Sequence, residues 1–322
     1  MRFSPAEIES AQRVVYAAMP PTPQYAWPLL RERLGMTVWV KHENHTPAGA
    51  FKVRGGLVYF EELARARPRP AGVVAATRGN HGQSVGWGAR KYGMDATIVV
   101  PHGNSVEKNA AMRALGVQLR EHGEDFQAAR EFAIALAQER GLHMVPSFHR
   151  GLVQGVMTYW IEFFESFKRG EEPAVVYVPI GLGSGFCAAA AARAHTGAGS
   201  KLVGVVSAHA TTYLDSFRSK QVVASPVTTK LADGMACRVA EEEVLAIVLR
   251  EAEDIVAITD DEVAEAMRIL FTDTHNVAEG AGAAGLAAAI RMRGRWPGGD
   301  VGFALTGGNV DRDVFARVLA ST

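Results

Sequence analysis

Two cysteines, a balance of charges and no long apolar run distinguish this sequence at first sight. Cys187 and Cys237 lie 50 residues apart and have neither CxxC nor Cys/His ligand spacing. The sequence therefore predicts neither a disulfide framework nor a zinc site. Lysine plus arginine equals aspartate plus glutamate, 34 against 34. Because the chain has no net charge, neither nucleic acid nor an anionic membrane is an expected partner.

Targeting and membrane-spanning segments are also missing from the sequence. Residues 1–9 are charged and polar, whereas a signal peptide needs an apolar stretch. The longest apolar run, 186–192, is alanine-rich and too short to cross a bilayer. The 322 residues, of which 48% are hydrophobic, suffice for about two domains with sizeable cores. We expect a cytoplasmic protein of enzyme size.

Short apolar runs alternate with longer amphipathic segments along most of the chain. The alternation follows an N-terminal helix that is expected to end near Met19 and a proline-rich break at 20–23. This pattern predicts an α/β fold with mainly parallel sheets. The expected strands are 37–40, 73–77, 96–100, 117–120, 175–178, 202–206 and 301–305.

Unusual loops follow several of these strands. In α/β sheets, ligands bind at the carboxyl ends of strands, where loops meet helix N-termini. The sequence predicts four such loops, namely the segment around Lys52, residues 77–83, residues 181–185 and residues 306–311.

Lys52 has the surroundings of a Schiff-base nucleophile. It stands just before a helix expected over 54–66. Three effects favour its neutral amine: the positive end of the helix dipole, the like charge of Arg54, and desolvation by Phe51 and Val53. A neutral amine can attack an aldehyde. Taken alone, however, such a run more often holds a solvated lysine of a first helical turn.

The loop 181–185, Gly-Leu-Gly-Ser-Gly, follows an expected buried strand and precedes an alanine-rich helix. Its backbone N–H groups are suited to a phosphate at the helix N-terminus. A dinucleotide fingerprint is disfavoured, because Phe186 stands in place of its third glycine and 203–207 holds no acid for a ribose. A plain strand-to-helix turn remains the other interpretation.

Asn80, His81 and Thr306 are polar side chains at the ends of strands. Asn80 can present its amide to a ligand, or it can cap the helix that continues to Tyr92. His81 can act as a general base, although a lone histidine beside a cap is more often structural. Thr306 offers a hydroxyl to a ring nitrogen or another acceptor.

Together these motifs resemble the fold-type II pyridoxal-phosphate enzymes, specifically their serine/threonine dehydratase branch. The resemblance runs from about Pro21 to Asp311. It implies two domains, each with a twisted, mainly parallel sheet flanked by helices. Residues 1–50 and 151–322 are expected to form a large cofactor-binding domain. Residues 51–150 are expected to form a small domain that carries Lys52 and the loop for the substrate carboxylate.

The resemblance also implies roles for individual residues. Lys52 would form the Schiff base with pyridoxal 5'-phosphate and act as the catalytic residue, Asn80 would hydrogen-bond the phenolic oxygen, and Thr306 would face the ring nitrogen. The implied cofactor-binding residues are Phe51, Lys52, Asn80, Gly181, Leu182, Gly183, Ser184, Gly185 and Thr306. The implied substrate-binding residues are Thr77, Arg78, Gly79, Asn80 and His81.

The sequence departs from the family pattern near the expected substrate. Arg78 replaces a serine or threonine, and its guanidinium is a poor base, so racemisation is not expected. Arg78 is suited to a second carboxylate, as in 3-hydroxyaspartate, or to an aromatic ring, as in β-phenylserine; it can also point to solvent. Ala50 enlarges the space near the β-carbon. The segments 146–150 and 155–158 also differ from the family.

The predicted function is conversion of a β-hydroxy-α-amino acid to a 2-oxo acid and ammonia by α,β-elimination. Val206 and Ser207 stand where metal-activated relatives carry a glutamate, so no divalent metal site is expected. The alternatives are a β-replacement synthase, which Val53-Arg54 and His81 disfavour, and a non-catalytic module that binds a cofactor or nucleotide. A homo-oligomer, a dimer or larger, is expected from the family.

Overall fold

The computed structural model describes residues 1–296 and 299–321. Its strands in chain order are β1 (Gln24–Ala26), β2 (Val38–His42), β3 (Gly72–Ala76), β4 (Asp95–Val100), β5 (Gln118–Glu121), β6 (His143–Met144), β7 (Val175–Pro179), β8 (Lys201–Ser207), β9 (Ala252–Ile258) and β10 (Val301–Leu305). All seven strands expected from the sequence are present, with ends that differ by no more than two residues.

Helices connect these strands and flank the sheets. They are α1 (Pro5–Tyr16), α2 (Pro28–Leu34), α3 (Lys52–Arg65), α4 (Asn80–Tyr92), α5 (Val106–Ala114), α6 (Phe126–Arg140), α7 (Arg150–Glu165), α8 (Ser184–Thr196), α9 (Thr212–Ser219), α10 (Glu242–Glu251), α11 (Asp260–Thr274), α12 (Gly280–Arg291) and α13 (Arg312–Ala320). Two short 3-10 turns are η1 (Glu43–His45) and η2 (Asp233–Met235).

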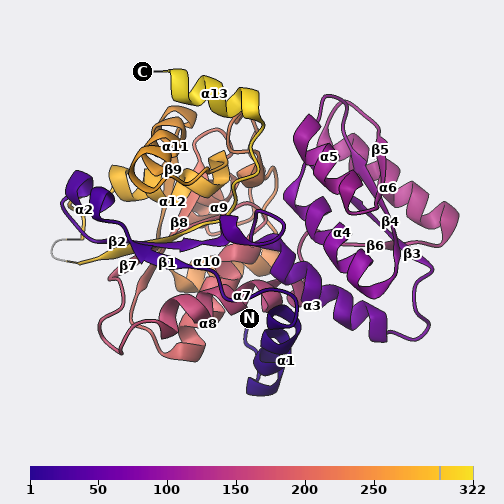
Figure 1. The fold of residues 1–322 in the computed structure, drawn as a ribbon, viewed down its shortest axis with the longest axis horizontal. Coiled ribbons are helices and arrows are strands. Elements are labelled where there is room, and N and C mark those ends of the chain that lie inside the picture. Colours follow the sequence, from indigo (N-terminus) through magenta and orange to yellow (C-terminus); the bar gives the residue numbers. More distant parts are fainter. Residues whose placement is uncertain (297–298, 322) are drawn as a thin grey trace.

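The strands form two sheets, one in each half of the molecule (Figure 1). The six-stranded sheet has the order β1-β2-β10-β7-β8-β9, and the four-stranded sheet has the order β5-β4-β3-β6. Within the described chain, β1 and β2 pair in antiparallel fashion and all other neighbouring strands are parallel. The predicted α/β fold with two mainly parallel sheets is therefore confirmed.

Three strands were not expected from the sequence. β1 and β6 have three and two residues, too few to show a period. β9 follows α10 without a turn, and its second and third residues, Glu253 and Asp254, interrupt the apolar run. The N-terminal helix also ends at Tyr16, before the Met19 expected from the sequence.

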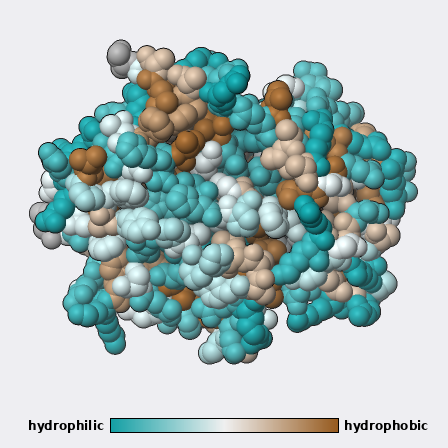
Figure 2. Space-filling model, viewed as in Figure 1, coloured by the Kyte–Doolittle hydropathy of each residue, from teal (hydrophilic) through white to brown (hydrophobic). Residues whose placement is uncertain are grey.

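Both faces of the six-stranded sheet are covered by apolar side chains. On one face α7 and the alanine-rich α8 pack against β7 and β8, and on the other α11 and α12 pack against the same strands. The side of the surface drawn in Figure 2 is mainly hydrophilic, with apolar residues gathered over α11 and α13. In the described part of the chain, no helix is long and apolar enough to span a membrane.

The first turn of α3 is attached to the six-stranded sheet. The Phe51 amide donates to the Thr306 carbonyl over 3.0 Å, and Ala50 forms a β-bridge with Gly307. The rest of α3 packs against α4 and α7, so the helix lies between the two sheets (Figure 1). A domain boundary at residues 50/51 and 150/151 stays a prediction.

Candidate active site

The predicted cofactor-binding residues surround one pocket at the carboxyl ends of β7 and β10. All nine of them line it, although they come from four separate parts of the chain. The pocket is also lined by Tyr159, Val178, Pro179, Gly234, Met235, Glu279 and Ala281. Parallel strands bring these loops together because their carboxyl ends lie on one edge of the sheet.

Lys52 reaches this pocket from the first residue of α3. Part of its side chain is exposed to the pocket, but protein surrounds the amine. Burial lowers the pKa of Lys52, and the nearby Glu279 carboxylate opposes this shift. A buried amine with a lowered pKa is a better nucleophile than a solvated ammonium. The structure therefore excludes the solvated lysine of the alternative interpretation.

The glycine loop leads from β7 into α8. Gly183 is the N-cap of α8 and has a φ of 97°, in the left-handed region that favours glycine. A Cβ at Gly181 would lie 2.3 Å from the Gly234 carbonyl oxygen, so the loop has no room for a side chain there. The first backbone amides of α8 have no acceptor within the helix. They line the pocket and form a cradle suited to an anion.

Asn80 does not cap α4, so that alternative is wrong. The N-cap is Gly79, and no side chain accepts a bond from the first turn. Instead, the Asn80 amide nitrogen donates to Glu279 Oε1 over 2.5 Å, and its oxygen accepts from Asn309 Nδ2 over 2.9 Å. These two contacts fix the orientation of the amide in the pocket.

Thr306 follows β10 and is buried at the floor of the pocket. Its hydroxyl donates to the Ala281 carbonyl over 3.3 Å, and the O–H can rotate to donate to a ring nitrogen instead. A neutral hydroxyl at this place fits the prediction of a partner for a ring nitrogen.

The loop predicted to bind the substrate lies beside the pocket. Thr77 Oγ1 accepts from the Gly79 amide over 3.0 Å and shapes the loop. Arg78 is exposed, with no hydrogen bond or ion pair to any residue in 1–296 or 299–321. His81 Nε2 is buried without a partner among those residues, and burial, together with Lys52, lowers the pKa of His81 to about 3. Substrate binding by these residues stays a prediction.

The two segments that differ from the family, 146–150 and 155–158, do not line the pocket. His149 caps α7, and Arg150 forms an ion pair with Glu7. Val156 and Met157 belong to the hydrophobic core. Tyr159, the residue directly after the segment 155–158, is the side chain through which α7 lines the pocket.

Sequence reasoning missed three charged residues at the pocket. Glu279 lines it directly, and Lys108 lies 3.5 Å from Glu279 Oε2 and 3.1 Å from Asp233 Oδ2. Glu279 directly precedes the glycine-rich start of α12, and this acid before glycines was the sequence feature that could have indicated a pocket residue. No group of three or more histidine, cysteine, aspartate or glutamate side chains that could hold a metal ion occurs in the described ranges.

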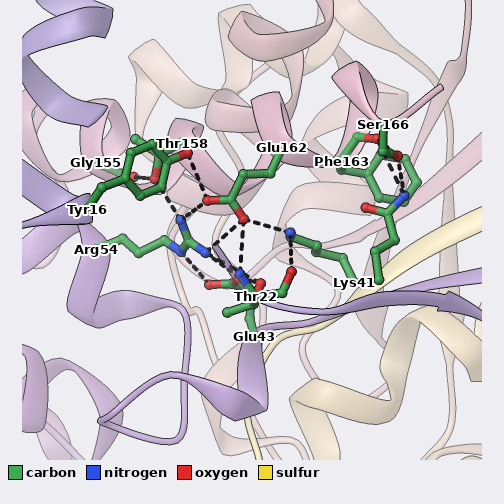
Figure 3. Close-up of polar contacts among 11 residues, drawn as sticks. Tyr16, Thr22, Lys41, Glu43, Arg54, Gly155, Thr158, Glu162, Phe163 and Ser166 are labelled. Atoms are coloured by element: carbon green, nitrogen blue, oxygen red, sulfur yellow. Dashed lines mark hydrogen bonds and ion pairs between the residues drawn. The ribbon is translucent and has the colours of Figure 1, made fainter. Parts of the chain in front are cut away.

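Arg54 does not act on Lys52 in the way expected from the sequence. Its guanidinium is fully buried and bonds two carboxylates: Glu43 Oε2 lies 2.8 Å from Nε, and Glu162 Oε1 lies 2.5 Å from Nη1 (Figure 3). Lys41 Nζ also lies 2.6 Å from Glu162 Oε2. Because the two acids neutralise the two bases, Arg54 supplies no free charge, and the pKa of Lys52 is set by burial and Glu279.

The polar groups of the pocket match the groups of pyridoxal 5'-phosphate. A buried amine can bind an aldehyde, the amides at the start of α8 can bind a phosphate, and the Thr306 hydroxyl can bind a ring nitrogen. Asn80 retains one N–H of its amide for a further acceptor, since each side-chain amide has two donors. The donor set therefore fits this cofactor.

Known proteins agree with this interpretation. The model of the family described as "Pyridoxal-phosphate dependent enzyme" matches residues 15–307. The chain is 30% identical to L-threonine ammonia-lyase of Thermotoga maritima over 97% of this chain and 77% of that protein. It is 29% identical to L-threo-3-hydroxyaspartate ammonia-lyase of Saccharomyces cerevisiae over 93% and 91% of the two chains. The crystal structure of the threonine deaminase of T.th. superimposes with a TM-score of 0.87, 27% identity and coverage of 96% and 99%.

Proposed function

Because this chain belongs to the family of pyridoxal-phosphate dependent enzymes, we propose that it is a dehydratase, or ammonia-lyase, acting on a β-hydroxy-α-amino acid. The products are a 2-oxo acid and ammonia. The observation that carries the proposal is the convergence of a buried amine, an amide cradle and a buried hydroxyl on one pocket. The relatives named as ammonia-lyases support the reaction type.

Lys52, the glycine loop, Asn80 and Thr306 are proposed to hold the cofactor. Bound pyridoxal phosphate supplies an electron sink that weakens the Cα–H bond of an attached amino acid. The amides of residues 80 and 81, at the start of α4, bind the substrate carboxylate. The neutral Lys52 amine then accepts the Cα proton, and its lowered pKa supports this role.

Adding a methyl group at Gly181 is expected to weaken cofactor binding. In Gly181→Ala the new Cβ would lie 2.3 Å from the Gly234 carbonyl oxygen, so the loop 181–185 must move. Overpacking costs about 1–3 kcal/mol, which corresponds to an affinity about 5-fold to 150-fold lower. Fluorescence titration of the apoprotein with pyridoxal phosphate measures this affinity. Gly199→Ala, where a Cβ meets open space, is the matched control, and equal affinities in both variants would contradict the proposed cradle.

Arg78 is proposed to select the substituent on the β-carbon. Its exposed side chain has no partner in the described chain and is free to turn toward an arriving substrate. Arg78→Ala is expected to lose about 10-fold to 150-fold more kcat/KM on 3-hydroxyaspartate than on serine, since a charge-assisted contact contributes roughly 1.5–3 kcal/mol. Keto acid assays with both substrates measure the ratio. Equal losses would mean that the arginine only shapes the loop.

Two other functions remain to be distinguished from dehydration. A β-replacement synthase would add a nucleophile at the β-carbon and release a new amino acid instead of a keto acid. A non-catalytic binding module would hold the cofactor without turnover. Keto acid release from serine, threonine, 3-hydroxyaspartate or β-phenylserine without an added nucleophile supports the dehydratase and excludes both alternatives.

A homo-oligomer and a cytoplasmic location are kept as proposals. The family resemblance supports the first, and the two unpaired cysteines support the second. Light scattering after size exclusion tests the oligomer, and a monomer at micromolar concentration would contradict it.

A further inference from the structure

Glu279 is a buried carboxylate whose position the proposed mechanism does not explain. It is the N-cap residue of α12, yet its side chain accepts no hydrogen bond from the first turn of that helix. An acid at an N-cap normally bonds those amides. Here the carboxylate turns into the pocket instead, where it is 4% exposed. A Cβ at Gly307 would lie 2.5 Å from Glu279 Oε1, so the missing side chain of Gly307 leaves the space that the carboxylate fills.

One oxygen of this carboxylate accepts a hydrogen bond, and the other accepts none from the described residues. Oε1 accepts from Asn80 Nδ2 over 2.5 Å. Oε2 is buried and has no hydrogen-bond partner among residues 1–296 and 299–321; the ammonium of Lys108 lies 3.5 Å away. A buried carboxylate oxygen without a donor is costly unless it carries a proton or meets a ligand.

The surrounding charges favour a protonated carboxyl. Lys108 is shared with Asp233, so the three side chains carry two acids and one base when all are ionised. Burial raises the pKa of Glu279; Lys108 opposes this shift and Asp233 adds to it. The Asp233 side chain is 34% exposed, whereas those of Lys108 and Glu279 are 9% and 5% exposed, so the cluster leads from the pocket toward solvent.

The position of Glu279 relates it to the leaving group. It lines the same pocket as Lys52. On the opposite side, Lys108 packs against the proposed carboxylate loop, because a Cβ at Gly79 would lie 2.5 Å from Lys108 Cδ. A substrate that reaches both Lys52 and this loop would therefore lie beside Glu279, which shares the pocket with Lys52 and pairs with Lys108.

We propose that Glu279 donates the proton on which the β-hydroxyl group leaves as water. Lys52 takes the Cα proton, and the electron pair of the Cα–H bond forms the Cα=Cβ double bond. The Cβ–O bond breaks with its electron pair on oxygen, and that oxygen takes the proton of Glu279. After product release, Lys52 gives up the Cα proton to water and Glu279 regains a proton from water, so both groups return to their starting states. Lys108 and Asp233 are positioning residues that set its charge. This inference rests on the proposed function.

A change of leaving group tests the proposal. Chloride departs without a proton, so Glu279→Gln is expected to lose about 100-fold or more of kcat on serine, the usual contribution of a general acid, and about 3-fold at most on 3-chloroalanine. Glutamine keeps an oxygen for the Asn80 bond, so the fold of the pocket is preserved. Glu253→Gln, at an exposed glutamate of β9, is the matched control and should keep both activities. Equal losses on the two substrates, or no loss on serine, would overturn the proposal.

Substitution of Lys108 or Asp233 tests whether Glu279 acts as an acid, because a purely structural role of Glu279 would not shift the pH dependence of activity. An acid catalyst must be protonated, so activity on serine falls as the pH rises through its pKa. Lys108→Met removes a charge that lowers the pKa of Glu279, and it should move this alkaline limb to higher pH. Asp233→Asn removes a charge that raises the pKa of Glu279, so this variant should move the alkaline limb to lower pH. Shifts in one common direction, or none, would contradict the assignment.

Infrared spectroscopy gives a readout that does not depend on activity. The cofactor-loaded protein at pH 7 should show a protonated carboxyl band that disappears in Glu279→Gln and persists in Glu253→Gln. Absence of this band in the wild-type protein would overturn the inference. If the wild-type protein releases no keto acid from any of the four hydroxy amino acids, the proposed function itself fails, whatever the infrared result.

Discussion

Lys52→Ala is expected to remove covalent attachment of the cofactor and nearly all turnover. The amine is buried in the pocket with a lowered pKa, and it is proposed both to bind the aldehyde and to accept the Cα proton. Loss of the general base alone reduces kcat by about 10²–10⁴, and loss of the attachment adds to it. Keto acid release measures turnover. Borohydride reduction followed by peptide mass spectrometry measures attachment, which should appear on the peptide that contains Lys52.

Lys168→Ala is the matched control for this experiment. Its side chain is 86% exposed, so the variant should keep both attachment and turnover. Thermal unfolding checks that Lys52→Ala remains folded. A reduced cofactor still attached to the Lys52→Ala protein would assign the aldehyde to another lysine, and unchanged turnover would remove Lys52 from the mechanism.

Arg54→Met is expected to destabilise the fold more than any surface charge removal. The guanidinium bonds Glu43 and Glu162 and also donates to Thr158 Oγ1 over 3.0 Å (Figure 3). Burial by itself would raise the pKa of Glu162, but Arg54 and Lys41 outweigh it and hold that pKa below its usual value. Without Arg54 only Lys41 remains to balance two buried carboxylates. Breaking such a network costs about 3–5 kcal/mol of the free energy of unfolding.

Urea unfolding of Arg54→Met, of Arg13→Met and of the double variant Arg54→Met with Glu43→Gln tests whether the lost charge of Arg54, and not its lost shape, causes the loss of stability. Arg13→Met removes an arginine whose side chain is 65% exposed and should have little effect on stability. Adding Glu43→Gln to Arg54→Met restores the charge balance and should recover part of the loss. If the double variant is no more stable than the single one, the uncompensated charge is not the cause.

The same network explains how Lys52 is positioned. Arg54 lies half a turn beyond Lys52 on α3, and its partners come from η1 and α7, next to the six-stranded sheet. The backbone bond from Phe51 to Thr306 attaches the residue before Lys52 to the same sheet. Arg54→Met is therefore expected to weaken cofactor attachment as well as stability.

Much of the site could be predicted because its signals are local. The glycine loop and the threonine before two glycines stand directly after strands, and the lysine in an apolar run follows β2 after a short connection. Parallel strands place such loops on one edge, so their convergence follows from the α/β pattern. The error on Arg54 had the opposite origin, since a neighbour in sequence was taken to be an electrostatic neighbour. Its charge is in fact neutralised by acids 11 and 108 residues away.

The fold class, the family and the residues whose chemistry a short motif specifies can be inferred from the order of amino acids. The partners of those residues follow only from the folded structure. Glu279 bonds Asn80 across 199 residues, and Lys108 meets Asp233 across 125. The charge of a buried acid depends on such distant neighbours, because burial and paired charges set its pKa. A motif can therefore identify the nucleophile, but which carboxyl holds a proton beside it depends on how the two sheets pack together.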